Sequence, residues 1–142
     1  MSVNLEGAFL AAKYAAPIMK SAWSGSIVLT SSTAGQYGYP FRAPYAAAKW
    51  AVIGLMKTLA MELGPYGIRA NAICPGYVKT PLVEAQIPDT AKEYNMTEEQ
   101  VIEQVILARQ PSKQFATTEQ VGGTAVFLCS DAAAQITGTT IS

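Results

Sequence analysis

A tyrosine and a lysine stand one helical turn apart in the segment Tyr45-Ala-Ala-Ala-Lys49. On a helix, residues i and i+4 project from one face, so we expect the lysine ammonium beside the phenol. A nearby positive charge favours the phenolate, and such a phenol can act as a general acid or base. The pair predicts proton-transfer chemistry. The alternative is a tyrosine on a core helix beside a solvated lysine, which has the same spacing.

A hydroxyl that could work with this pair belongs to Ser32, which follows the β-branched run Ser26–Thr30. Open α/β sheets present functional groups at the carboxyl ends of their strands. Ser32 is therefore predicted to hydrogen-bond a substrate oxygen on which negative charge develops. The alternative is ordinary turn capping, which Ser31 could perform equally well.

Two asparagine segments add further polar groups. Asn4 lies inside a predicted helix, where Asn is a mediocre helix former, and its side chain needs a partner such as a water chain to Lys49 unless it is simply at the surface. The segment Asn71-Ala-Ile-Cys-Pro-Gly76 closes a predicted strand with a turn on which a flat ring could rest. Its alternative is a plain strand-ending turn.

The elements that must position these residues alternate between helical and extended periodicity. A helix over 2–20 is predicted from an apolar stripe, and Tyr45–Leu63 predicts another that Gly64-Pro65 ends. Short apolar runs predict buried strands over Ser26–Thr30 and Ile68–Ile73. The stripe of the first helix comprises Val3, Leu10, Tyr14 and Ile18, and the shared face of the second comprises Val52, Met56, Leu59 and Leu63.

The last third of the chain carries three helix-start signals and one further strand signal. Thr80-Pro81 reads as an N-cap followed by proline, whereas Thr97 and Thr117 each precede a glutamine at the capping-box position. Gly138–Ser142 predicts the beginning of a strand. In residues 81–110 the acidic side chains are expected to form a solvated face and Val101–Ile106 a buried one.

This alternation predicts an α/β fold with a parallel sheet and crossover helices. Because two and a half strands make a poor sheet, we expect the C-terminal half of a doubly wound, Rossmann-like sheet. Residues 1–142 are interpreted as one partial domain of that sheet, with a helical segment at about 81–110.

Composition argues against several other classes of protein. The 142 residues carry ten basic and ten acidic side chains, which removes the main electrostatic argument for a nucleic-acid or membrane partner. With no histidine, neither a Ser-His-Asp triad nor a His-ligated metal can be built. Cys74 and Cys129 form no CxxC motif, and no apolar run approaches the roughly 20 residues of a bilayer span. A reduced, cytoplasmic location is expected.

Taken together, four motifs in order resemble the short-chain dehydrogenase/reductases: Val3-Asn4-Leu5, Ser32, Tyr45-x-x-x-Lys49 and Asn71-x-x-x-Pro75-Gly76. The resemblance covers essentially the whole chain. It implies that Tyr45 is the catalytic acid/base and that Lys49 promotes its ionisation and binds the nicotinamide ribose. Ser32 would hold the substrate oxygen, and Asn4 would anchor a proton-relay water.

The same resemblance implies a nicotinamide cofactor, NAD or NADP with NAD favoured, and hydride transfer to or from a small-molecule substrate. The nicotinamide end would be held by Pro75, Gly76, the backbone at Val78 and the hydroxyl of Thr80. No TGxxxGxG segment occurs in the sequence, although such a Gly-rich turn cradles the cofactor pyrophosphate in the family. The 142 residues alone are therefore expected to be inactive.

Downstream segments resemble more closely the bacterial 3-hydroxybutyrate dehydrogenases, namely Thr80–Ile87, Gln110–Phe115 and the stretch from Gly122 to Thr139. This likeness implies that Gln86 contacts a substrate carboxylate. Arg42 stands where that group has Lys and could grip a carboxylate in bidentate fashion. Tyr77 stands where the group has Trp, and Ala34 where it has His, which removes one donor. The implied substrate is 3-hydroxybutyrate or a related short hydroxy acid, bound by Ser32, Arg42, Tyr77 and Gln86.

Other interpretations remain open at this point. The chain could serve another alcohol or ketone specificity, or it could be a truncated, non-catalytic assembly module. In the family the helices corresponding to 2–20 and 45–63 pack across subunits into a four-helix bundle, which implies a homo-oligomer, a dimer or tetramer. An unrelated α/β protein with chance motifs is the third interpretation.

Overall fold

The computed structural model describes residues 2–142 and divides into two compact units. The first comprises the chain up to Pro75 together with Gly123–Ser142, and the second comprises Gly76–Gly122. Within these residues, no helix is both long enough and apolar enough to span a bilayer.

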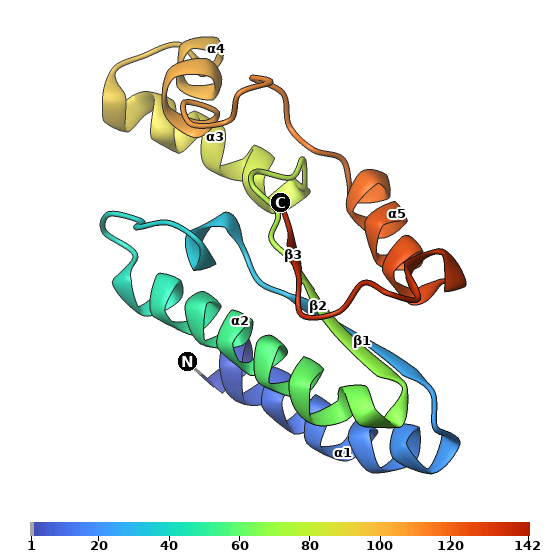
Figure 1. Cartoon of the computed structure of the whole chain (residues 1–142). Helices are drawn as coiled ribbons and strands as arrows, with labels where there is room; N and C mark the ends of the chain where they lie inside the picture. The colour runs from blue at the N-terminus through green and yellow to red at the C-terminus, as the bar shows by residue number, and fades with distance from the viewer. Residues whose placement is uncertain (1) are drawn as a thin grey trace. The chain divides into compact units, whose positions relative to one another are not determined.

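A parallel three-stranded sheet forms the centre of the first unit (Figure 1). Its strands are β1 (Gly25–Thr30), β2 (Ile68–Ile73) and β3 (Thr140–Ile141), in the order β1-β2-β3. The first two pair over their whole length, from Gly25 opposite Ile68 to Thr30 opposite Ile73. The predicted strands and the α/β fold class are confirmed.

Two long helices pack on this sheet and on each other: α1 (Gly7–Ala22), preceded by a π-helical turn over Ser2–Glu6, and α2 (Ala43–Leu63). The predicted inner face of α2 is confirmed, because Val52, Met56 and Leu63 are buried and Leu59 is partly buried against the same core. This apolar contact holds the start of α2 beside the end of β1, where the candidate site residues lie.

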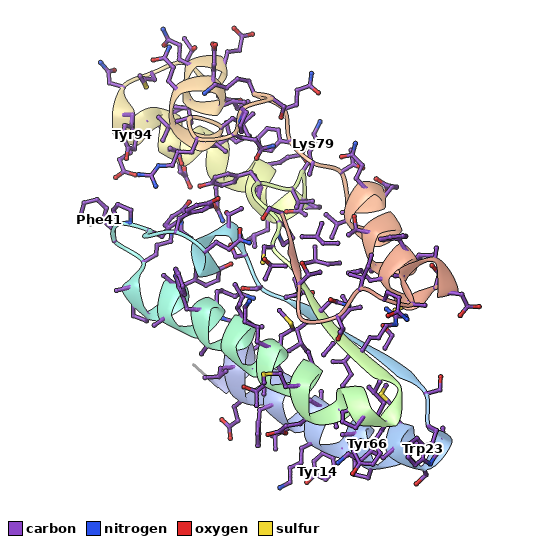
Figure 2. The ribbon with its side chains drawn as sticks, in the orientation of Figure 1. Tyr14, Trp23, Phe41, Tyr66, Lys79 and Tyr94 are labelled. Carbon is purple, nitrogen blue, oxygen red and sulfur yellow. The ribbon has the colours of Figure 1, made fainter. Side chains whose placement is uncertain are left out.

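The apolar stripe that predicted α1 lies on the outer side of that helix. Its members Val3, Leu10, Tyr14 and Ile18 are 39–86% exposed, and Tyr14 lies at the surface in Figure 2. The inner side is formed by smaller or flexible side chains, with Ala12 buried and Met19 packed against the core. Periodicity thus identified the helix but not the face that the sheet covers.

Helix α5 (Thr118–Cys129) is held at its carboxyl end by two strand residues. Ser26 Oγ and Arg69 Nη1 both donate to the Leu128 carbonyl, at 3.0 and 2.6 Å, and Arg69 Nη2 donates to the Ser130 carbonyl at 3.3 Å. These bonds satisfy carbonyls that the last turn of a helix leaves without partners.

The second unit contains α3 (Pro81–Tyr94) and α4 (Glu98–Val101), which continues as a π-helical turn over Ile102–Ile106. All three predicted capping signals are confirmed. Thr80 accepts from the Val83 amide, Thr97 and Gln100 form a reciprocal capping box, and Thr117 and Gln120 exchange the same two bonds. The acidic side chains of 81–110 are exposed, as the pattern predicts. On the predicted buried face Val101 is buried, whereas Ile102, Val105 and Ile106 are half-buried.

Candidate active site

Helix α2 presents the predicted acid/base pair from its first two turns. Pro44 lies in the first turn, where a missing backbone N–H costs no helical hydrogen bond. Lys49 Nζ lies 5.7 Å from the centroid of the Tyr45 ring, so the expected juxtaposition on one face is confirmed. Tyr45 is 38% exposed whereas Lys49 is 8% exposed, which leaves the phenol open to a reactant and the ammonium behind it.

The end of β1 provides the partner of this buried ammonium. Lys49 Nζ donates to the carbonyl oxygen of Thr30 at 3.0 Å. A buried charge is costly unless it is hydrogen-bonded or paired, so this bond fixes where the lysine head can lie. The ammonium is held between the carboxyl edge of the sheet and the phenol of Tyr45.

Ser32 begins the 3-10 turn Thr33–Gly35 directly after β1. Its Oγ accepts from the Ala34 amide at 3.1 Å, so the capping role considered for this residue is present. A hydroxyl that accepts one bond keeps its own hydrogen for donation. Ser32 can therefore cap the turn and donate to a substrate oxygen at the same time.

The loop that carries Ser32 is tied to the end of β2. The Thr33 amide donates to the Pro75 carbonyl at 3.1 Å, and the Ser31 amide donates to the Ile73 carbonyl at 2.8 Å. The first unit thus brings Ser32, Tyr45, Lys49 and Pro75 together at the carboxyl edge of the sheet.

A buried thiol lies next to this group. Burial raises the pKa of the Cys74 thiol, while hydrogen bonds with the Ser31 side chain and the Ser32 backbone, and the charge of Lys49, act in the opposite direction. The net rise keeps Cys74 protonated near neutral pH. Its role here is that of a packed, weakly polar neighbour.

Asn4 and Arg42 both occupy exposed positions near α2. Asn4 lies in the π-helical turn that packs against α2, and its side chain is exposed. The proton-relay role of Asn4 stays a prediction. Arg42 immediately precedes α2, and its guanidinium carbon lies 6.0 Å from the centroid of the Tyr39 ring.

The predicted cofactor segment of the second unit forms a short bridge between Val78 and Ala116. The Ala116 amide donates to the Tyr77 carbonyl at 3.0 Å, and the Lys79 amide donates to the Ala116 carbonyl at 2.8 Å. Because the bridge uses groups of Tyr77 and Lys79, the N–H and C=O of Val78 itself point to the opposite edge. Such a donor and acceptor side by side are complementary to a carboxamide.

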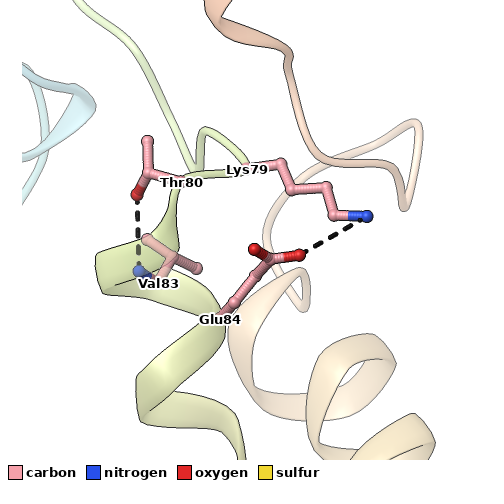
Figure 3. A network of polar contacts seen from close by, with 4 residues as sticks. All are labelled: Lys79, Thr80, Val83 and Glu84. Atoms are coloured by element: carbon pink, nitrogen blue, oxygen red, sulfur yellow. Dashed lines mark hydrogen bonds and ion pairs between the residues drawn. The ribbon is translucent and has the colours of Figure 1, made fainter.

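Thr80 follows as the N-cap of α3 (Figure 3). Its Oγ1 accepts from the Val83 amide at 3.3 Å, so its hydrogen also stays available for donation. Lys79 and Glu84 form an exposed ion pair at 3.6 Å beside the cap. Gly76 and Gln86 are exposed, Gln86 on α3.

Sequence reasoning named the segments that contain Asn71 and Gln110 but missed the roles of these two side chains, which organise backbone near the predicted site residues. In the second unit, Gln110 accepts from the Tyr77 amide at 3.4 Å and donates to the Gln114 carbonyl, which fixes the segment before Val78. In the first unit, Asn71 is fully buried in β2 and bonds the backbone that leads to β3. Both act on backbone groups distant in sequence, so no local pattern marks these roles.

Comparison with known proteins gives consistent results. A family model described as enoyl-(acyl carrier protein) reductase matches residues 1–142. A D-beta-hydroxybutyrate dehydrogenase of Rhizobium meliloti is 49% identical over 142 residues, covering 100% of this chain and 55% of that protein. One from Cupriavidus necator is 40% identical over 138 residues, covering 97% of this chain and 54% of that protein. The chain thus spans about half the length of the relatives it matches.

Solved structures show the same fold. An actinorhodin polyketide ketoreductase solved with NADPH superimposes with a TM-score of 0.87 at 31% identity, covering 97% of this chain and 53% of that one. The three-stranded parallel sheet is therefore part of a larger doubly wound architecture in this relative.

Proposed function

The chain belongs to the short-chain dehydrogenase/reductase family of oxidoreductases, and we propose that it carries the catalytic residues of a nicotinamide-dependent dehydrogenase. The reaction is hydride transfer between the cofactor and a hydroxyl or carbonyl carbon. The observation that supports this proposal most directly is the placement of Lys49. Its side chain is buried, and its ammonium donates to the Thr30 carbonyl and lies 5.7 Å from the centroid of the Tyr45 ring.

The proposed roles follow from the contacts of each side chain. In alcohol oxidation the hydroxyl proton passes to Tyr45, and Lys49 favours the ionised phenol that accepts it. Ser32 Oγ accepts from the Ala34 amide and keeps its own hydrogen, which it donates to the substrate oxygen as the charge on that oxygen changes. Asn4 is proposed to hold a water that exchanges the proton with solvent.

The residues present fit the nicotinamide end of the cofactor, which supplies or accepts the hydride when bound. The outward N–H and C=O of Val78 would pair with the carboxamide, and Thr80 can donate while capping α3. Lys49 and Tyr45 would bind the ribose, and the turn at Pro75 and Gly76 would lie against the ring. NAD is the proposed cofactor over NADP.

For the substrate we propose 3-hydroxybutyrate or a related short hydroxy acid. Support comes from the two D-beta-hydroxybutyrate dehydrogenases among the similar proteins. Arg42 and Gln86 would bind the carboxylate, with Tyr77 beside the carbon chain. Arg42→Gln and Gln86→Ala are expected to raise KM for hydroxy acids while leaving activity on neutral alcohols unchanged, whereas equal effects on both substrate classes would refute these assignments.

We also propose a homo-oligomer, a dimer or tetramer, assembled through the outer face of α1. That face exposes Val3, Tyr14 and Ile18 at 86%, 69% and 73%, and we expect burial of such large apolar side chains to favour association. An Ile18→Glu substitution should shift the protein toward monomer in light scattering. A wild-type protein that is monomeric throughout the accessible concentration range would refute the proposal.

The decisive experiment is turnover by Tyr45→Phe in the protein expressed from its complete coding sequence. Loss of the phenolic oxygen should lower kcat by about 100-fold or more, the scale of general acid–base catalysis, with cofactor affinity nearly unchanged. Tyr66→Phe, at the opposite end of the sheet, serves as a matched control. Retained activity in Tyr45→Phe would refute the catalytic assignment, and a folded wild type without turnover on any hydroxy acid or ketone would favour a non-catalytic assembly module.

A further inference from the structure

Two residues at the end of β1 hydrogen-bond with Lys49, one with its side-chain ammonium and the other with its backbone carbonyl. The Thr30 carbonyl accepts from Nζ at 3.0 Å, and the hydroxyl of the next residue, Ser31, donates to the Lys49 backbone carbonyl at 2.8 Å. Ser31 is 3% exposed and Lys49 is 8% exposed. The last residue of β1 and the residue that follows it thus fix the ammonium and the backbone carbonyl of Lys49 on α2.

Gly35 permits this contact by having no side chain. A Cβ at residue 35 would lie 2.5 Å from Ser31 Oγ and 2.8 Å from the Lys49 carbonyl oxygen. Such distances are far shorter than van der Waals contact, so any larger residue would push the turn Thr33–Gly35 away from α2. The hydrogen bond between Ser31 and Lys49 therefore requires glycine at position 35.

Ser31 is itself immobilised from the side of β2. Its amide donates to the Ile73 carbonyl at 2.8 Å, and its side chain is buried. Because Ser31 is fixed relative to β2, its hydrogen bond also fixes the backbone of Lys49 relative to the sheet. Because Ser32 follows directly, the same strand end sets the position of the proposed substrate-binding hydroxyl.

We propose that Ser31 is a positioning residue for Lys49, fixing α2 at that residue so that the ammonium stays between Thr30 and Tyr45. This role rests on the proposed function only for its catalytic consequence. Apolar contacts also hold α2 against the sheet, but such contacts on their own tolerate small shifts along the helix axis. A hydrogen bond at residue 49 itself removes that freedom at the residue where position matters for proton transfer.

The first test measures the accessibility of Lys49 and does not require turnover. Cofactor-free protein, expressed from its complete coding sequence, is acetylated with an N-hydroxysuccinimide ester, and modification is followed by mass spectrometry. In Ser31→Ala, Lys49 should react about tenfold faster, the factor corresponding to one lost hydrogen bond. Lys57, an exposed lysine on the same helix, is the internal reference and should react at an unchanged rate.

The second test separates positioning from stability by kinetics. Ser31→Ala should lower kcat about tenfold with KM changed by less than about twofold. Ser31→Thr, which keeps the hydroxyl, should restore most of kcat, and Gly35→Ala should reproduce the defect. Thr58→Ala removes a bond of the same type on the exposed side of α2, from Oγ1 to the Gly54 carbonyl at 3.0 Å, and should change neither readout.

A Ser31→Ala protein with wild-type Lys49 labelling and kcat would overturn the proposal, even if its melting temperature fell. If Ser31→Ala does not fold, Ser31→Cys takes its place under the same criteria, because a thiol keeps the shape but donates weakly. An inactive wild type would refute the proposed function alone. In that case the labelling ratio of Lys49 to Lys57 still supports or overturns the positioning role.

Discussion

Replacing Asn71 by alanine should release the segment that leads into β3. Asn71 is fully buried, its Nδ2 donates to the Ile136 carbonyl at 2.8 Å, and its Oδ1 accepts from the Thr139 amide at 3.2 Å. The substitution leaves one part-buried carbonyl and one part-buried amide without their partner. Each such loss costs about 1–3 kcal/mol, so we expect the free energy of unfolding to fall by about 2–6 kcal/mol.

The effect should be concentrated where β3 pairs with β2. The Ala72 amide donates to the Thr139 carbonyl at 3.0 Å, and the Cys74 amide donates to the Ile141 carbonyl at 2.7 Å. Urea unfolding of the protein expressed from its complete coding sequence gives the total loss. Hydrogen exchange of these two amides shows whether the loss is local.

Thr137→Val supplies the matched comparison for Asn71→Ala. Thr137 Oγ1 accepts from the Ala70 amide at 3.1 Å, so this substitution removes one bond in the same region at nearly constant volume. It should cost about 1 kcal/mol, clearly less than Asn71→Ala. The reasoning fails if Asn71→Ala costs no more than Thr137→Val, or if the exchange of the Ala72 and Cys74 amides is unchanged.

Four further substitutions or modifications test individual contacts of the described structure. Arg69→Met removes two donors from the carbonyls at the end of α5 and should lower the unfolding free energy by about 1–3 kcal/mol in urea; no change would refute the role. Iodoacetamide at neutral pH should modify exposed Cys129 and leave buried Cys74 intact until the protein unfolds. Burial raises the pKa of Cys74 in the folded state, so the thiol of the unfolded chain ionises at a lower pH than that of the folded chain. The free energy of unfolding should therefore fall as the pH rises above about 9.0. Cys74→Ala should lessen this alkaline loss of stability in urea titrations. Thr80→Val should speed hydrogen exchange in the first turn of α3 by removing its cap, whereas Thr80→Ser should not.

Local signals in the sequence were sufficient to locate the elements. The strand predicted over Ile68–Ile73 has those bounds in the structure, because breakers flank a short apolar run. The starts of α3, α4 and α5 were also predicted, since a capping side chain bonds an amide only two or three residues ahead. Where the interacting groups are adjacent in sequence, the sequence pattern is sufficient to predict the local structure.

The exposed face of α1 could not be predicted in the same way. Its large apolar side chains, such as Tyr14 and Ile18, form the stripe that periodicity detects, yet alanine and methionine face the sheet. A close helix–sheet contact favours small inner side chains such as Ala12, and these give a weak periodic signal. Which face is covered depends on what packs against it, and that information is nonlocal.

The two adjacent serines show where sequence reasoning about a site reaches its limit. Ser31 and Ser32 are chemically identical and both follow the same strand, so either could cap the turn that begins there. The pleat of the strand end distinguishes them, because successive side chains point to opposite sides. Ser31 therefore turns toward α2 and bonds Lys49, whereas Ser32 caps Thr33–Gly35 and keeps a hydrogen to donate. A one-residue shift of β1 against β2 would exchange these roles, and that register is held by pairing that extends from Gly25 to Thr30.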